Sequence, residues 1–238
     1  MLAGELVEAI ELVLFTQGRS SQAGSAGHPN QSSAETRELL EQLVALSDLL
    51  HLTAYDVDAD PAAATRFNVT AVPTVIIRRR DPATVMLRSD GPVAGSGQHV
   101  PGIAGERNTN VRFIGLPGGY EFSSLLAAIV DLSSGRTDLS AHARDVVGAI
   151  ERPMHIQVFV TPSCPYCPRA VRMAHQLAMH NPQIVAEAIE ANEFQELSER
   201  YRVRSVPKTV IDDRIEFVGS LPEAKVLEAL QEAVSRHA

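Results

Sequence analysis

Cysteine and tryptophan are scarce or missing in this sequence: its 238 residues include two cysteines and no tryptophan, and aromatic residues make up 5%. Two cysteines are too few for a secreted scaffold that is held together by disulfide bonds. Long apolar runs are missing too, since no stretch approaches the ~18 uninterrupted apolar residues of a transmembrane helix. We therefore expect neither a disulfide-stapled secreted domain nor a membrane-spanning protein.

Positive charge is also in short supply. The chain has 21 Lys and Arg against 29 Asp and Glu, which gives a formal net charge of −8. This balance disfavours nucleic acid and anionic membranes as partners. Residues 1–15 contain an apolar run but neither Lys nor Arg, whereas a secretory signal peptide starts with basic residues. We therefore expect no targeting segment, no nucleic-acid or membrane partner, and a cytoplasmic location.

What is present is an ordinary globular composition with an internal repeat. Hydrophobic residues make up 45% and charged residues 21% of the chain. In each half an apolar strand precedes a helix, a second strand, a Val-Pro step (Val72-Pro73, Val206-Pro207) into a third strand, a strand ending at Gly, and an amphipathic helix. The repeat predicts an α/β protein of two units, residues 1–135 and 136–238, each with a mixed sheet flanked by helices.

Apolar spacing predicts the helices of both halves. In the first half, Ser32 and Glu35 fit a capping box at the start of a helix. The stripe that follows it consists of Leu39, Leu43, Leu46 and Leu50. In the second half, one helix carries Val171, Ala174, Leu177 and Ala178 on one face, and the last helix carries Val226, Leu227, Leu230 and Val234. Residues 133–140 separate the halves; we expect an opening helix at 141–150 and its counterpart at 5–11.

Two segments break the repeat. Residues 17–32 are small and polar and predict a loop, and residues 78–110 predict a long excursion with a local hairpin at 84–88. We expect the lone loop histidines His28 and His99 to be solvated.

The two cysteines, Cys164 and Cys167, lie in the segment CPYC directly after an apolar strand. We place Cys164 at the start of a helix with Pro165 at the first helical position, which favours proline. The free N–H groups and partial positive charge of that helix end stabilise a thiolate on Cys164. Cys167, one turn later, is within disulfide-bonding reach. We expect the exposed Cys164 to attack a substrate disulfide and the more buried Cys167 to resolve the mixed disulfide.

Other interpretations of the cysteines compete with this one. A zinc or iron–sulfur centre needs about four ligands, so two thiols would serve only a centre shared between two chains, as in a dimeric iron–sulfur carrier. The chain could also be a partner-binding or chaperone-like module with incidental cysteines. A purely structural disulfide that closes so short a ring adds little stability. The context of the motif favours a redox centre with no metal and no bound cofactor beyond the Cys164–Cys167 disulfide.

CPYC resembles the glutaredoxin-type active-site segment, and SVPKTV (205–210) resembles the loop that carries the cis-proline of thioredoxin-fold proteins. Three segments, FIGLPGGYEF (113–122), FVTPSCPYCP (159–168) and AVRMAHQLA (170–178), resemble the two-unit protein disulfide oxidoreductases, whose units have a thioredoxin/glutaredoxin-like fold. They are also similar to the doubled domain of bacterial alkyl hydroperoxide reductase flavoproteins, whose first unit has lost its cysteines. The resemblance implies two tandem thioredoxin-like units and a protein disulfide oxidoreductase, with Cys164 as nucleophile and Cys167 as resolving thiol.

The resemblance also implies partners and a substrate-binding surface. Pro207 would be cis, with its ring beside the cysteines, and the backbone of Val206 would pair with a substrate strand. Pro165 and Tyr166 complete the implied substrate-binding residues. Protein disulfides, among them that of a peroxiredoxin, would be substrates, and a thioredoxin-reductase-like flavoenzyme would supply electrons.

The sequence departs from the family pattern in several places. Val158 stands where thioredoxins have a buried acid, so the proton of Cys167 must leave through water or another group. Glu187 and Glu190 are candidates, although solvated strand-end positions suit them better. We expect Arg169 and Arg172 to be largely solvated. The basic residue and the double glycine of glutaredoxins are replaced, which argues against glutathione as the dedicated substrate. The first unit lacks cysteines, so we predict an inert unit that scaffolds the second or docks a partner.

Overall fold

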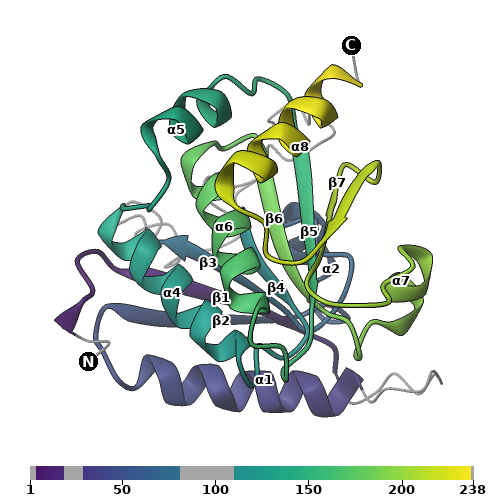
Figure 1. Ribbon diagram of the computed structural model, residues 1–238. Helices are drawn as coiled ribbons and strands as arrows, with labels where there is room; N and C mark the ends of the chain where they lie inside the picture. The colour runs from purple at the N-terminus through teal and green to yellow at the C-terminus, as the bar shows by residue number, and fades with distance from the viewer. Residues whose placement is uncertain (1–3, 19–28, 81–109, 237–238) are drawn as a thin grey trace.

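The computed structural model describes residues 4–18, 29–80 and 110–236 (Figure 1). Its described strands form one eight-stranded mixed sheet with the order β2-β1-β3-β4-β6-β5-β7-β8. The strands are β1 (Ile10–Thr16), β2 (Leu50–Asp56), β3 (Thr74–Arg79), β4 (Val111–Ile114), β5 (Met154–Val160), β6 (Ile184–Glu190), β7 (Lys208–Ile211) and β8 (Ile215–Val218). The helices are α1 (Pro29–Val44), α2 (Pro61–Arg66), α4 (Glu121–Ser134), α5 (Ala141–Gly148), α6 (Cys167–His180), α7 (Gln195–Arg200) and α8 (Glu223–Ser235).

The two halves of the sheet have the same pairing pattern. β1 pairs in parallel with β2 and antiparallel with β3, which pairs antiparallel with β4. β5 pairs in the same way with β6 and β7, and β7 pairs with β8. The halves meet where β4 pairs in parallel with β6, so the sheet is continuous. A mixed sheet flanked by helices is the fold class that the sequence predicts.

Backbone details repeat between the halves as well. The Val72-Pro73 and Val206-Pro207 bonds are both cis, as predicted for Pro207. The carbonyl of Pro73 accepts a hydrogen bond of 2.9 Å from the N–H of Gly115, and that of Pro207 accepts one of 2.8 Å from Gly219. These two glycines have φ angles of +95° and +94°, a region that favours glycine. The last strand of each half therefore ends in the same turn.

The two faces of the sheet are covered unequally. One face carries α1, α4, α5, α6 and α8, whose apolar residues form a single large core with the strands. On the other face, α2 and α7 each cover a smaller apolar cluster, one in each half. α4 and α6 pack against each other and lie side by side in front of the sheet in Figure 1. This contact joins a helix of the first half to the helix that begins at the cysteines.

Several predictions for the first half are wrong. α1 begins at Pro29, so Ser32 lies inside the helix and does not cap it, and residues 29–32 are not loop. Leu46 lies beyond the end of α1 and is 62% exposed, and Leu50 begins β2. The buried face of α1 consists of Ser33, Thr36, Leu40 and Leu43. Because Ser33 and Thr36 are polar, the spacing of apolar residues in the sequence does not indicate which face of α1 is buried.

The expected helix at 5–11 is also absent from the described residues, because β1 already begins at Ile10. The N–H groups of Val7 and Glu8 donate hydrogen bonds of 2.9 and 3.0 Å to the Ser133 hydroxyl at the end of α4. This tertiary contact satisfies backbone groups that a helix would otherwise pair internally. The predicted hairpin at 84–88, His28 and His99 lie outside the described residues.

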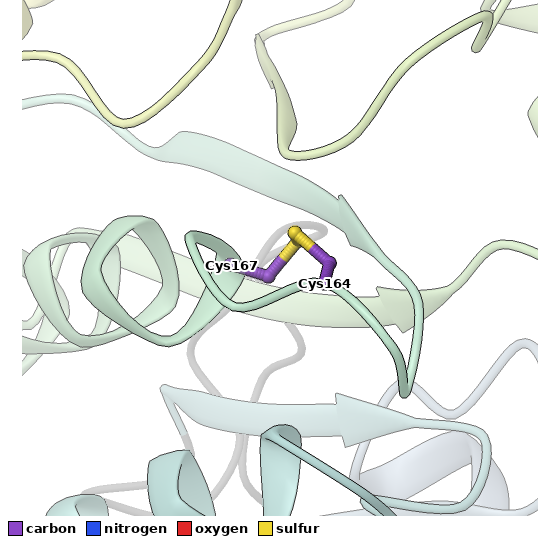
Figure 2. The surroundings of a disulfide bond; sticks show 2 residues. All are labelled: Cys164 and Cys167. Carbon is purple, nitrogen blue, oxygen red and sulfur yellow. A yellow bond between two sulfur atoms is a disulfide. The ribbon is translucent and has the colours of Figure 1, made fainter.

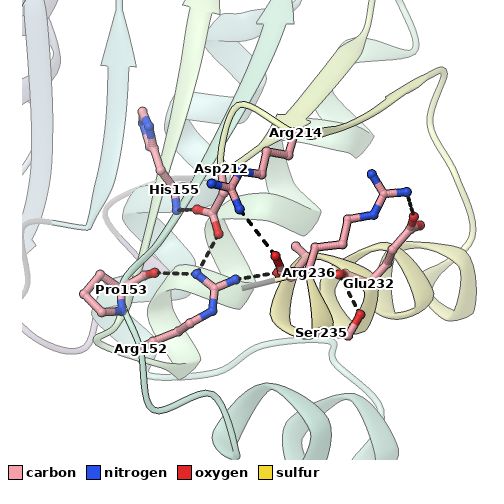
Figure 3. A network of polar contacts seen from close by, with 9 residues as sticks. Arg152, Pro153, His155, Asp212, Arg214, Glu232, Ser235 and Arg236 are labelled. Atoms are coloured by element: carbon pink, nitrogen blue, oxygen red, sulfur yellow. Dashed lines mark hydrogen bonds and ion pairs between the residues drawn. The ribbon is translucent and has the colours of Figure 1, made fainter. Parts of the chain in front are cut away.

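The second half follows the predictions more closely. α5 occupies 141–148, and the four predicted apolar residues of α6 are all buried. On α8 the buried face ends with Ala233, so the prediction that Val234 belongs to this face is wrong, and Val234 is exposed. The Arg152 guanidinium fastens this helix end to the sheet, because it donates to the carbonyl of Ala233 and to the Asp212 carboxylate, both at 2.8 Å (Figure 3). Across the described segments, no helix combines the length and apolar character needed to span a membrane.

Candidate active site

The two cysteines form a disulfide bond at the N-terminal end of α6 (Figure 2). β5 ends at Val160, and a turn brings Cys164 into place, with its N–H donating a hydrogen bond of 3.1 Å to the carbonyl of Thr161. The Cα atoms of Cys164 and Cys167 are 5.5 Å apart. The sequence expectation that these thiols lie within bonding reach is met.

The helix begins later than predicted. α6 starts at Cys167, with Tyr166 as its N-terminal flanking residue, so Pro165 lies in an exposed turn before the helix. Pro168 occupies the first helical turn, where a backbone N–H has no acceptor within the helix. Pro168 therefore costs no helical hydrogen bond. Cys164 therefore lies before the first residue of α6 and not within the helix.

The burial of the two cysteines differs in the expected direction. Cys164 is 7% exposed and Cys167 is fully buried, and both belong to the main apolar core. The expectation of an exposed Cys164 is wrong, because this residue packs within the main apolar core. The adjacent Tyr166 side chain is 72% exposed. The more accessible cysteine is therefore itself recessed, and it lies two residues before a protruding aromatic side chain.

A loop of the first half packs against the cysteine loop. The N–H of Tyr120 donates a hydrogen bond of 2.9 Å to the carbonyl of Pro162, two residues before Cys164. Gly119 has a φ of +58°, and a Cβ atom at this position would lie 2.2 Å from the same carbonyl oxygen. Only glycine allows this approach without a shift of the backbone. The first half thus shapes the site directly.

Glu121 follows this contact and is the functional candidate that sequence reasoning missed. It lies in the first turn of α4, is 2% exposed, and makes no hydrogen bond of ordinary geometry within the described residues. Burial raises the pKa of Glu121 to about 7, and the nearby Ser124 hydroxyl offsets only part of this effect. The signal in the sequence is an acid within the apolar segment FIGLPGGYEF, in the half that has no cysteines.

One cavity among the described residues lies away from the disulfide. It has a volume of about 1240 Å³ and opens on the sheet face that α2 and α7 leave uncovered between them. Its lining includes Val72, Arg112, His155 and Glu187, and none of the described lining residues belongs to CPYC. This cavity is therefore not part of the disulfide site.

Several relatives of this chain are named as alkyl hydroperoxide reductases. A family model described as a thioredoxin domain matches residues 154–232. The alkyl hydroperoxide reductase protein AhpF of Staphylococcus epidermidis is 32% identical over 104 residues, which cover 44% of this chain and 20% of that protein. AhpF of Xanthomonas campestris pv. phaseoli is 24% identical over 230 residues, 97% of this chain and 37% of that protein. The chain spans well under half the length of these relatives.

Solved structures agree with this fold. A protein disulfide oxidoreductase from Aeropyrum pernix superposes with a TM-score of 0.76 at 27% identity, covering 98% of this chain and 88% of that one. The NTD_N/C domain of alkyl hydroperoxide reductase AhpF from Enterococcus faecalis gives 0.75 at 24% identity, covering 96% and 95%. The chain has a thioredoxin-like fold. Its relatives support a disulfide oxidoreductase activity in general terms.

Val158 of β5 is buried and apolar. This chain therefore has no buried acid at the position where thioredoxins carry one. The expectation of solvated strand-end carboxylates at Glu187 and Glu190 is wrong, because both are buried. Burial alone would raise the pKa of Glu187, but the hydrogen bond and charge of His155 and the charge of Arg112 lower it. It lines the cavity on the opposite face, and Glu190 accepts the N–H of Glu193 at 2.6 Å. Both carboxylates are therefore engaged elsewhere.

The two arginines of α6 also differ from each other. Arg169 is exposed, as expected. Arg172 is not simply solvated, because it donates two hydrogen bonds of 3.0 and 2.9 Å to Asp131 of α4 and pairs with Asp138 at 2.7 Å. Its partners lie far away in the sequence, so no local pattern could reveal them. The pair fixes α4 against α6.

The predicted substrate edge lies in the loop before β7. Val206 is half-buried, and its N–H and C=O groups have no hydrogen-bond partner within the described residues. The next residue, Pro207, is buried. An extended peptide could pair with the free backbone groups of Val206.

Proposed function

We propose that this chain is a dithiol–disulfide oxidoreductase that acts on protein disulfides, with Cys164 as the nucleophile and Cys167 as the resolving thiol. The observation that carries the proposal is the disulfide at the N-terminus of α6, in which Cys164 is the more accessible of the two residues. The thioredoxin-like fold and the disulfide oxidoreductase among its structural relatives support it.

The reaction starts from the reduced dithiol. The Cys164 thiolate, stabilised by the N-terminus of α6, attacks one sulfur of a substrate disulfide. The substrate S–S bond breaks, one substrate sulfur leaves as a thiolate, and a mixed disulfide forms. Cys167 loses its proton and attacks the Cys164 sulfur, which releases the second substrate thiolate. The substrate gains two electrons and the Cys164–Cys167 pair loses two.

Glu121 is our candidate for the acceptor of the Cys167 proton. A carboxyl group with a pKa of about 7 changes its protonation state readily at neutral pH, as a general base requires. Its helix packs on α6, the helix that begins at Cys167. The first half would thus supply the acid that Val158 does not.

We propose a division of labour between residues 1–135, which lack cysteines, and residues 136–238, which carry the redox centre. Pro165, Tyr166, Val206 and Pro207 would contact the substrate. A flavoenzyme similar to thioredoxin reductase would supply electrons, and no bound cofactor is needed beyond the disulfide. Relatives named as alkyl hydroperoxide reductase favour a peroxiredoxin as one substrate, since peroxide reduction leaves such an enzyme with a disulfide. A cytoplasmic location suits a disulfide that is catalytic rather than structural.

Insulin reduction with dithiothreitol as the electron source tests the proposal. The wild-type protein should accelerate precipitation of the insulin B chain, and Cys164→Ser should return the rate to that of dithiothreitol alone. Cys167→Ser should accumulate a mixed disulfide with insulin, visible by mass spectrometry without reductant. Thermal melts of the reduced proteins control for folding. Full activity of the Cys164→Ser protein would overturn the assigned role and favour a partner-binding module.

A further inference from the structure

Two exposed tyrosines flank the starts of the two neighbouring helices. Tyr120 directly precedes α4 and is 51% exposed, and Tyr166 directly precedes α6 and is 72% exposed. They are among the few large hydrophobic side chains that the described surface leaves open. α4 and α6 pack against each other, and the hydrogen bond from the Tyr120 N–H to the Pro162 carbonyl places the start of α4 beside the loop that leads into α6.

The backbone fixes Tyr120 beside the cysteine loop. Its N–H donates to the carbonyl of Pro162, and the neighbouring Gly119 touches the same carbonyl group. Pro162 is two residues before Cys164, and Tyr166 is two residues after it. The two tyrosines therefore come from opposite halves of the chain: the backbone of Tyr120 is hydrogen-bonded to the loop that precedes Cys164, and Tyr166 follows Cys164 in the sequence.

We propose that Tyr120 and Tyr166 form an aromatic docking surface for an extended, apolar protein segment that carries the substrate disulfide. The proposal rests on the dithiol–disulfide function above. Cys164 is recessed, so a substrate must lay its chain over the surrounding surface to bring its own sulfur within reach. The free N–H and C=O of Val206 suit an extended backbone, and tyrosine rings suit apolar side chains next to the substrate cysteine.

This surface distinguishes substrate classes and assigns a task to the first half. A small disulfide reaches Cys164 without contacting either ring, whereas a protein segment contacts both. The half without cysteines thereby contributes to specificity through Tyr120. An aromatic contact of this kind changes a rate constant by up to about tenfold.

Single-turnover kinetics of the pre-reduced, full-length protein test this surface. The protein is mixed with insulin or with bis(2-hydroxyethyl) disulfide, and thiol loss is followed by quenching with an alkylating reagent. Tyr120→Ala and Tyr166→Ala should each lower the ratio of the insulin rate constant to the small-disulfide rate constant by about threefold to tenfold. Tyr120→Phe keeps the ring and should keep most of the ratio. Leu46→Ala, which removes an exposed side chain beyond the end of α1, is the control.

The outcomes separate the two proposals. An unchanged ratio in Tyr120→Ala, with an active wild-type protein, would overturn the docking surface and leave the oxidoreductase function standing. An equal loss on both substrates would also overturn it, because it would show an effect on the redox centre rather than on recognition. A wild-type protein that reduces neither substrate would refute the oxidoreductase function, and the docking surface with it.

Discussion

The Glu193 carboxylate, in the loop before α7, accepts a hydrogen bond of 2.8 Å from the backbone N–H of Leu116. Leu116 follows β4 of the first half, and Glu193 follows β6 of the second. The hydroxyl of Ser32, in α1, donates to the same carboxylate. One side chain of the second half thus holds two segments of the first. Together with the contact of Tyr120 on Pro162, it makes the junction of the halves specific rather than merely apolar.

Replacing Glu193 should weaken that junction. Glu193→Ala leaves the Leu116 N–H and the Ser32 hydroxyl without their acceptor in a partly buried site, and such losses cost about 1–3 kcal/mol. We expect a decrease of this size in the free energy of unfolding, measured with urea. Glu228→Ala removes an exposed carboxylate of α8 and should change stability by less than about 0.5 kcal/mol. Equal effects of the two variants would show that the Glu193 contacts contribute nothing.

Gly119 offers a sharper test of the contact beside the disulfide, because Gly118 is a matched control. An added Cβ at Gly119 meets the Pro162 oxygen at 2.2 Å and sits at a φ of +58°. An added Cβ at Gly118 meets only the Leu116 side chain, at 3.6 Å. Gly119→Ala should therefore lower the free energy of unfolding by about 1–3 kcal/mol and slow insulin reduction, whereas Gly118→Ala should do neither. Normal activity of Gly119→Ala would mean that this loop does not support the cysteine site.

Glu121 should give the protein a pH-dependent stability. Burial raises the pKa of Glu121 from about 4.5 to about 7, so between these pH values the folded state binds more protons than the unfolded state. The free energy of unfolding then falls as pH rises through this window, by on the order of 3 kcal/mol in total, and the penalty persists at higher pH. Glu121→Gln removes the charge and should be more stable than wild type at pH 8.

Urea unfolding of the oxidised proteins at pH 4.5 and pH 8 measures this effect. The advantage of Glu121→Gln should shrink toward the lower pH, and Glu41→Gln, on the exposed side of α1, should show no such trend. Glu121→Gln should also slow resolution of the mixed disulfide near neutral pH if Glu121 accepts the Cys167 proton. A variant that resolves at the wild-type rate would leave Glu121 a structural residue only.

Local patterns in the sequence were enough for much of the fold and for the cysteine pair. The α6 stripe, the Val-Pro steps and CPYC after an apolar strand each depend on residues within a few positions of one another. The start of α6 could not be placed as well, because Pro165 and Pro168 both suit a first helical turn. Only the observed turn at Cys164 shows that Pro168 occupies it.

Features that depend on contacts between the halves were not predictable from such patterns. Glu121 looks like an ordinary first-turn acid of a helix, and its burial follows from the packing of α4 within the main core and against α6. The buried face of α1 does not follow the apolar spacing, because Ser33 and Thr36 also face the core. In each case the environment is set by residues far away in the chain, and a single sequence does not show which of them meet.

The pair of Arg172 and Asp131 provides a final test of how α4 and α6 are joined. Arg172 binds both carboxylate oxygens of Asp131, and Gln176 donates to one of them at 2.8 Å. Asp131 is largely buried, whereas the Arg172 side chain is 41% exposed, so solvent screens part of the attraction. Arg172→Met should lower the free energy of unfolding by about 1–3 kcal/mol, because Asp131 keeps its charge and loses its cation.

A double-mutant cycle isolates the pair from the other contacts. Asp131→Asn alone should also destabilise, and the double variant should lose less than the sum of the two single losses, by about 1 kcal/mol. The control is the exposed pair of Lys225 and Glu228 on α8, for which the coupling should be below about 0.5 kcal/mol. Additive losses at Arg172 and Asp131 would mean that the pair does not hold α4 to α6. The first half would then be held beside the disulfide by backbone contacts and apolar packing instead.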